Sequence, residues 1–177
     1  RFDGHELPGD INGMTVASAT ALAGRGLMGV AKDTFATGGR VMSFVVGFAE
    51  VEVDVETGAI RMVDYVGSAD CGTVVHPRLL GSQIHSAGIQ GFGIALSQKW
   101  VFDPVWGVTF AKRLYTARPP GMLDVPLDMQ WEAVGLADPG TPVGAKGIGE
   151  PCVGAGSAAL TSAISDAMEG VCLCRTP

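Results

Sequence analysis

The chain has 177 residues and a formal net charge of −6, with 17% charged and 47% hydrophobic residues. It has no basic run that would support nucleic-acid binding, and no apolar run approaches the ~18 residues that a membrane-spanning helix needs. A soluble domain ordinarily has about 25% charged residues, so we expect another polypeptide to cover part of the surface.

The chain begins with RFDGHELPGD rather than methionine, and no charged-then-apolar signal segment opens it. We therefore expect a processed chain, or a piece of something longer, in the cytoplasm. The cysteines (Cys71, Cys152, Cys172 and Cys174) and the histidines lack the spacing of a zinc site. We expect reduced thiols, one or two of them buried.

The first 36 residues divide into two predicted segments. Residues 1–13 are polar and turn-rich, which predicts a surface arm. Over residues 14–35, small and apolar residues recur at helical spacing and predict a helix. Near its start, Ala17, Ser18, Ala19 and Thr20 offer backbone N–H groups and two hydroxyls, which suits a phosphate or pyrophosphate. A plain N-cap in a helix contact explains the same four residues equally well.

Residues 41–53 and 59–70 predict two strands joined by the turn Glu56-Thr57-Gly58, with glycine where a positive φ is wanted. Residues 77–96 predict a helix that proline opens. This helix carries Gly81, Gly88, Gly91 and Gly93, and each costs up to ~1 kcal/mol relative to alanine. So many glycines in one helix indicate that something packs very near its backbone.

The remaining segments predict mainly strands and one helix. Residues 99–103 and 108–112 predict a short strand pair, and residues 129–134 a further strand. A Gly/Pro-rich loop, 135–154, leads to a last helix at about 155–168. Helices and strands without regular βαβ alternation predict an α+β fold.

The loop VGAKGIGEPCVG, residues 143–154, contains one acid, Glu150, in flexible and apolar surroundings. In a loop it gains little from helix dipoles, and only Lys146 is close in sequence. No lysine-serine or lysine-threonine pair closes the loop, so it is not a Walker-type phosphate loop. Glu150 is then either an ordinary solvated acid or a general base that the loop aims at a reacting group.

Gln83 lies in GSQIHSAGIQGFG, on a glycine-rich stretch of the predicted helix 77–96. An amide donates and accepts hydrogen bonds in one plane, which suits a heterocycle. A core or partly exposed glutamine is the simpler interpretation. We expect His85, which lies on another face of the helix, to be structural or exposed.

In combination these stretches are more specific. The chain resembles the C-terminal part of the molybdenum-binding subunit in the xanthine dehydrogenase/aldehyde oxidase family of molybdenum hydroxylases, over about residues 14–170. The resemblance rests on VEVDVETGAIRMVDYVGSADCGTVVHPRLLGSQIHSAGIQGFGIAL, DVPLDMQWEAV and GAKGIGEPCVGAGSAALTSAISDAMEG. It implies an α+β molybdopterin-binding domain at 14–170, after the arm 1–13 and before a tail at 171–177.

The resemblance also implies roles for three groups. Glu150 matches the glutamate of the family's GxGE loop, the base that activates a metal-bound hydroxyl. Gln83 matches a glutamine that binds the pterin, although Ser82 replaces a glycine before it. Ala17, Ser18, Ala19 and Thr20 match, more loosely, a turn that holds the pterin and phosphate side. No direct protein ligand to the metal is implied.

The implied activity is hydroxylation of a carbon centre in an aldehyde, a purine or an N-heteroaromatic, with oxygen from water. The implied cofactor is molybdenum-molybdopterin, in the plain or cytosine dinucleotide form, with FAD and [2Fe–2S] clusters on partner chains or domains. The implied partners are the N-terminal half of the molybdenum subunit, an FAD subunit and an iron–sulfur subunit, with a dimer of the whole assembly.

The sequence leaves two other functions open. One is a non-catalytic assembly or scaffold module that keeps the fold without the cofactor. The other is a stand-alone domain that binds an anion at residues 17–20. The substrate and the electron acceptor are not encoded in recognisable residues of this chain.

Overall fold

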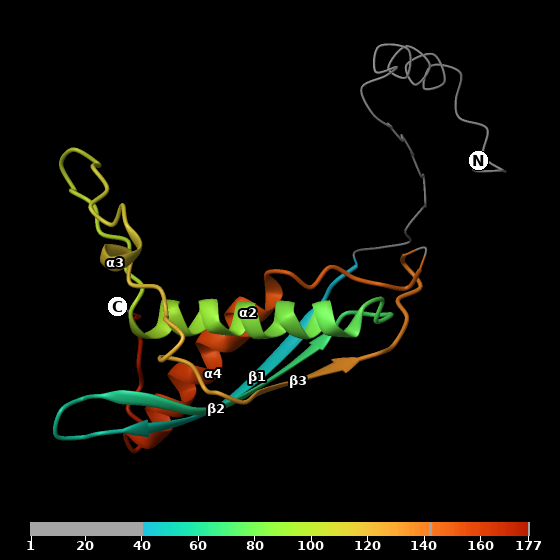
Figure 1. Ribbon diagram of the computed structural model, residues 1–177, viewed down its shortest axis with the longest axis horizontal. Coiled ribbons are helices and arrows are strands. Elements are labelled where there is room, and N and C mark those ends of the chain that lie inside the picture. Colours follow the sequence, from blue (N-terminus) through green and yellow to red (C-terminus); the bar gives the residue numbers. More distant parts are fainter. Residues whose placement is uncertain (1–40, 142, 177) are drawn as a thin grey trace, which may run out of the picture. The chain divides into compact units, whose positions relative to one another are not determined.

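The computed structural model describes residues 41–141 and 143–176 (Figure 1). The chain divides into two compact units, Arg1–Ala36 and Thr37–Pro177, and the described residues belong to the second. The predicted arm at 1–13, the predicted helix at 14–35 and the turn at 17–20 therefore lie outside the described residues. The domain boundaries at 13/14 and 170/171 stay predictions.

The second unit contains three strands and three helices in the part of the chain that is described. They follow the order β1 (Phe44–Val53), β2 (Ile60–Asp70), α2 (Pro77–Leu96), α3 (Leu114–Ala117), β3 (Met129–Val134) and α4 (Pro151–Ala167). The predicted bounds of α2 and β3 are confirmed. Within the described residues, no helix is both long and apolar enough to cross a bilayer.

The strands form one sheet in the order β1-β2-β3. β1 and β2 make the predicted antiparallel hairpin. In its turn Gly58 has a φ of +72°, and the Asp54 carboxylate accepts hydrogen bonds from the backbone N–H groups of Glu56 and Thr57. β3 pairs in parallel with β2, and α2 lies between them in sequence. The mixed sheet with packed helices confirms the α+β class.

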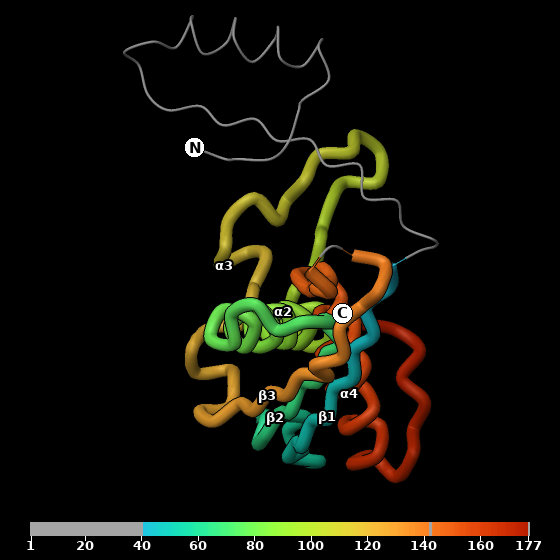
Figure 2. The backbone as a smooth tube through the Cα atoms, turned by 90° about the vertical axis from the view of Figure 1, so that its right-hand side faces the viewer, coloured from blue at the N-terminus to red at the C-terminus, as the bar shows by residue number. Residues whose placement is uncertain are grey.

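Helices α2 and α4 cover one face of the sheet (Figures 1 and 2). Residues that alternate along β2 point into this layer and are buried, because side chains on a strand alternate between its two faces. The centre of the layer holds Tyr65 of β2 and Phe92 of α2, which pack edge to face with ring centroids 4.9 Å apart. Leu160 and Ile164 of α4 complete this cluster.

The two long helices approach each other through glycines. A Cβ added to Gly156 of α4 would lie 2.6 Å from the carbonyl oxygen of Gly88 in α2 and 2.8 Å from its Cα. Real Cβ atoms do not come so close to backbone, so Gly156 excludes a side chain at this contact. Gly91 of α2 excludes one as well, because its Cβ would lie 2.4 Å from the Val153 carbonyl oxygen of α4. The predicted close approach to the backbone of helix 77–96 is confirmed, and α4 is the element that makes it.

Three predicted elements differ from the observed ones. Strand β1 begins at Phe44 rather than at residue 41. Helix α4 begins at Pro151 rather than near residue 155, because proline at the first helical position has the φ that the helix requires. Residues 99–112 form a turn with an isolated bridge between Phe102 and Thr109, instead of a strand pair. The turn at 104–107 formed as predicted, with Gly107 at a φ of +66°.

The glycine contact predicts opposite effects for two substitutions in α4. Gly156→Ala should lower the free energy of unfolding by about 1–3 kcal/mol, because the new methyl group forces the helices apart. Gly154→Ala meets no atom within 4 Å and should raise it by up to ~1 kcal/mol through helix propensity alone. Urea unfolding of the chain measures both, and a Gly156→Ala variant as stable as the parent contradicts the contact.

Candidate functional site

Glu150 is the N-cap residue of α4, with φ −90° and ψ −25°. Its side chain is exposed and makes no capping hydrogen bond. The sequence placed this acid within a loop, whereas α4 starts directly after it.

Gln83 lies on an exposed position of α2, close to the residue that precedes Glu150 in sequence. A Cβ added to Gly149 would lie 3.7 Å from the Oε1 atom of Gln83. The fold therefore brings together two of the groups that the sequence singled out, from segments far apart along the chain. The third group, Ala17–Thr20, falls outside the described residues.

The glycines of the loop leave space beside these two side chains. A Cβ added to Gly147 would meet no atom within 4 Å, and one at Gly149 would meet only the Gln83 amide. A large planar group could thus come close to the backbone here. The described residues form an open face around Glu150 and leave it exposed, so they do not enclose the acid by themselves.

The loop that precedes Glu150 is tied to the end of β2 by backbone hydrogen bonds. The Lys146 N–H donates to the Cys71 carbonyl over 2.7 Å, and the Thr73 N–H donates to the Gly144 carbonyl over 2.8 Å. Gly72, at a φ of +66°, lies directly against the Gly144 carbonyl, which leaves no room for a Cβ. The loop and the turn after β2 therefore fix each other.

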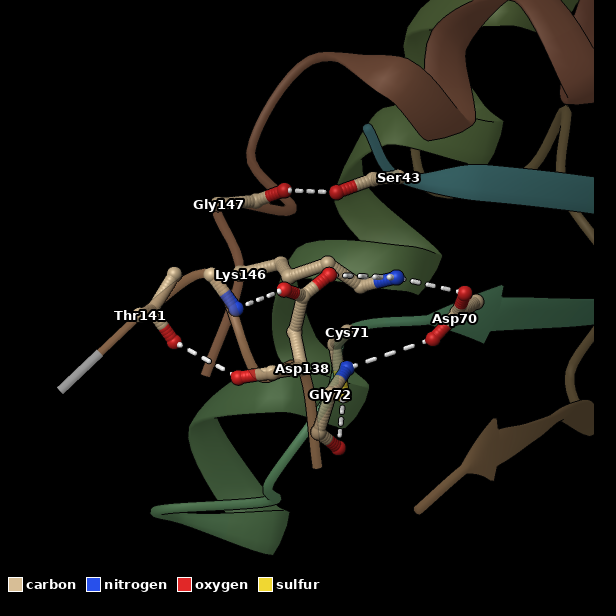
Figure 3. A network of polar contacts seen from close by, with 9 residues as sticks. Ser43, Asp70, Cys71, Gly72, Asp138, Thr141, Lys146 and Gly147 are labelled. Carbon is tan, nitrogen blue, oxygen red and sulfur yellow. Dashed lines mark hydrogen bonds and ion pairs between the residues drawn. The ribbon is translucent and has the colours of Figure 1, made fainter. Parts of the chain in front are cut away.

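Lys146 strengthens the same junction with its side chain (Figure 3). Its Nζ atom donates to Oδ2 of Asp70 over 2.5 Å and lies 3.8 Å from Oδ2 of Asp138. The hydrogen bond from Lys146, helped by one from the Gly72 N–H, lowers the pKa of Asp70. We did not predict this cluster; its one signal in the sequence is a lone lysine in an apolar loop.

The four cysteines are free thiols. Cys71 and Cys152 are buried in one core cluster, as predicted for one or two of them, whereas Cys172 and Cys174 are exposed with sulfur atoms 3.5 Å apart. Burial raises the pKa of the Cys152 thiol, and the neighbouring Cys71 adds to this effect. Cys152 thus belongs to the core under the Glu150 loop. In the described part of the chain, no cluster of three or more His, Cys, Asp or Glu could hold a metal ion.

His85 and Tyr65 each bury a polar atom. The Nε2 atom of His85 and the hydroxyl oxygen of Tyr65 have no hydrogen-bond partner among the described residues. Burial raises the pKa of Tyr65 to about 12, with a smaller contribution from Cys152. His85 is half-buried, in line with the structural role expected for it.

Comparison with known proteins identifies the family. Residues 12–126 match the family model of the molybdopterin cofactor-binding domain. The probable hypoxanthine oxidase XdhD of Escherichia coli K12 is 35% identical over 120 residues, which are 68% of this chain and 12% of that protein. The gamma subunit of the 6-hydroxypseudooxynicotine dehydrogenase complex of Paenarthrobacter nicotinovorans is 31% identical, over 75% of this chain and 17% of its own length.

A solved structure gives the same result. The aldehyde oxidoreductase of Desulfovibrio gigas superposes with a TM-score of 0.67 at 31% identity, over 76% of this chain and 14% of that enzyme. The chain belongs to the xanthine dehydrogenase/aldehyde oxidase family of molybdenum hydroxylases, which are molybdenum-dependent oxidoreductases. It spans less than a fifth of the length of these three relatives. The family-model match ends at residue 126, before the loop with Glu150.

The lowered pKa of Asp70 predicts a loss of stability in acid. A depressed carboxyl pKa contributes stability that is complete above the ordinary value of 3.8 and is lost as the pH falls through the folded value. Asp70→Asn should therefore lower the free energy of unfolding at pH 7. Below about pH 4, the free energy of unfolding of the variant should fall less steeply with decreasing pH than that of the parent. The exposed Asp128→Asn serves as the control. An Asp70→Asn variant with an unchanged acid profile contradicts the ion pair.

Proposed function

We propose that this chain is part of a molybdenum hydroxylase that hydroxylates a carbon centre with oxygen from water, and that Glu150 is its general base. The observation that carries the proposal is the placement of Glu150 at the N-terminus of α4, next to Gln83, in a chain of this family. The Glu150 carboxylate is exposed, and Lys146, the nearest base in sequence, pairs with Asp70 instead. The carboxylate oxygens of Glu150 are therefore free to accept a proton.

The residues of the open face fit a pterin cofactor. The Gln83 amide has donors and an acceptor in one plane, which match the edge of a heterocycle, and Gly147 and Gly149 leave room for a ring against the backbone. When bound, molybdenum-molybdopterin supplies the redox chemistry, and the protein supplies binding, orientation and proton transfer. We assign contacts with the pterin to Gln83 and to Ala17, Ser18, Ala19 and Thr20. The cofactor would be molybdopterin in its plain or its cytosine dinucleotide form.

In this role Glu150 would accept a hydroxyl proton at a carboxylate oxygen as the hydroxyl oxygen bonds to an electrophilic carbon of the substrate. The C–H bond of that carbon would break, and its hydrogen and two electrons would pass to the bound cofactor, which is the oxidant. A general base must lie within hydrogen-bond reach of the proton it removes, about 2.6–3.2 Å between heavy atoms. The substrate class is an aldehyde, a purine or an N-heteroaromatic, and relatives named for an aldehyde and for hypoxanthine fit this range.

The surface of the described unit fits a chain that works inside a larger assembly. In the first half of β1 the outward side chains are apolar and exposed, namely Phe44, Val46 and Phe48, with Phe48 at 66% exposure. The outward positions of the second half are Glu50 and Glu52. A groove of about 540 Å³ runs between β1 and α4, lined by valines, alanines and Phe48 among others. Large apolar surfaces of this kind mark sites of protein contact.

Residues 99–111, which we call the aromatic arm, extend from the end of α2 away from the sheet (Figure 2). The arm carries a second apolar surface. Its aromatic side chains are exposed, and Trp106 reaches 80%. The exposed aromatic residues of the arm are Trp100, Phe102, Trp106 and Phe110. Tryptophan is enriched among the residues that dominate protein interfaces, so the arm is suited to anchor a partner.

We propose that the partner on both surfaces is the N-terminal half of the molybdenum subunit, whether on the same polypeptide or a separate one. That half would complete the cavity around Glu150. A separate subunit would carry FAD, and an iron–sulfur subunit would carry the [2Fe–2S] clusters. We further propose a dimer of the whole assembly, in the cytoplasm. The small share of each relative that this chain spans, and the relative described as a complex subunit, support this arrangement.

The base role predicts a specific loss of turnover. In the assembled enzyme, Glu150→Gln should lower kcat by about 10²- to 10⁴-fold, because the amide cannot take the proton, while molybdenum content stays at the parental level. Glu132→Gln, at an exposed position of strand β3, is the control. An aldehyde, a purine and an N-heteroaromatic are assayed separately. A Glu150→Gln enzyme within about tenfold of the parent contradicts the base role, and a parental complex without molybdenum favours the scaffold function.

The partner surfaces predict that single substitutions weaken assembly. Phe48→Ser and Trp106→Ser should each reduce the affinity for the rest of the molybdenum subunit by about tenfold or more, because each removes a large apolar contact. Val55→Ser, at an exposed position of the β1–β2 turn, should have little effect. Copurification and size-exclusion chromatography measure assembly. Full assembly of both variants contradicts the assignment of these surfaces.

A further inference from the structure

We propose that Lys146 is a positioning residue, whose partly buried ion pair with Asp70 and Asp138 holds the Glu150 loop in the geometry that proton transfer requires. The inference rests on the proposed function of Glu150 and adds a residue that does not itself touch the reacting groups. The side chain of Lys146 is only 6% exposed, although its loop lies at the surface. A charged ammonium is rarely buried unless it is paired.

The ion pair joins three separate parts of the chain. Asp70 ends β2, Asp138 lies in the segment after β3, and Lys146 reaches both from the loop (Figure 3). Asp138 also accepts a hydrogen bond from the Gly140 N–H over 2.7 Å, and its own N–H donates to the Gly144 carbonyl over 2.9 Å. Each carboxylate therefore also accepts a hydrogen bond from nearby backbone, Asp70 from the Gly72 N–H and Asp138 from the Gly140 N–H.

The same loop is fixed on its other side, one residue after Lys146. The Ser43 hydroxyl, just before β1, donates to the Gly147 carbonyl over 2.6 Å. Only Ile148 and Gly149 then separate this anchor from Glu150, and Ile148 packs against the buried cluster around Cys71 and Cys152. The position of the Glu150 backbone is thus set by a short chain segment between fixed points.

Glycine makes these anchors necessary. Gly147 and Gly149 leave room for a bound group, but glycine has more backbone freedom to lose than any other residue. Without side-chain restraints, a loop of this composition would sample many positions of the carboxylate. Lys146 supplies a restraint from beneath the loop, where it leaves the open face clear.

The direction of Lys146 also affects the acid. A lysine that faced Glu150 would occupy the carboxylate oxygens that the proposed base needs free. Because Asp70 and Asp138 take the ammonium group on the inner side, the loop carries a cation without placing it against the acid. The pair therefore both anchors the loop and keeps its only cation away from Glu150.

The test compares Lys146→Met with Arg61→Met in the assembled enzyme. Arg61 pairs with Glu52 at the surface, where both side chains are more than half exposed, so its substitution removes an ion pair of little structural weight. Amide hydrogen exchange of residues 144–150 is measured together with molybdenum content, kcat and KM. For Lys146→Met we expect about tenfold or faster exchange in this loop, a fall in kcat of about tenfold or more, and little change in KM or metal content.

Arg61→Met should leave all four measurements at the parental level. If Lys146→Met does not fold, Asp70→Asn keeps the lysine, removes its nearest partner, and should raise exchange in the same loop. The proposal is overturned if amide exchange in the loop is unchanged in the variant that folds. It is also overturned if exchange becomes faster but kcat does not change, in an enzyme whose Glu150→Gln variant loses activity. If Glu150→Gln keeps its activity, the proposed function fails, and loop exchange alone decides whether Lys146 anchors the loop.

Discussion

The structure depends on the junction between the end of β2 and the loop that carries Glu150. Two backbone hydrogen bonds join Cys71–Thr73 to Gly144–Lys146, and they form only because Gly72 and Gly144 let the two backbones touch. This junction brings the start of α4 beside α2. As a result Glu150, which follows the loop, lies close to Gln83, which belongs to a helix more than sixty residues earlier in the sequence.

A second constraint, the glycine contact between α2 and α4, fixes the same arrangement from within the core. Gly88 and Gly156 allow the helix backbones to meet, and the buried side chains of Phe92 and Leu160 fill the space next to them. The core thereby fixes the relative positions of the N-terminal parts of α2 and α4 at the open face around Glu150. A site that relies on two helices held by packed glycines is more rigid than its glycine-rich sequence indicates, because packing replaces the missing side-chain restraints.

Much of this fold was predictable from local pattern, and the remainder was not. The bounds of α2 followed from Pro77 and apolar periodicity, and the β1–β2 hairpin from alternation around Gly58. Parallel pairing of β3 with β2 could not be predicted, since the paired segments are distant and periodicity carries no information on strand direction. The start of α4 was placed too late, because Gly154 resembles a residue of the glycine-rich loop, whereas Pro151 already occupies the first helical position. For the site, Glu150 and Gln83 were identified as separate residues, but their proximity and the partners of Lys146, 76 residues away at Asp70, are tertiary facts.

A glycine-rich, apolar loop can hold one acid in place because its glycines admit a large group, while contacts on the inner side of the loop fix the backbone. The central claim is that Glu150 faces the molybdenum centre across a boundary with another part of the enzyme. A crystal structure of this chain in its assembled, cofactor-loaded enzyme tests the claim most directly. The account predicts a Glu150 carboxylate oxygen within about 3 Å of a group bound to the metal, with neighbouring polypeptide enclosing it. A carboxylate that points into bulk solvent, with the cofactor held elsewhere, would contradict it.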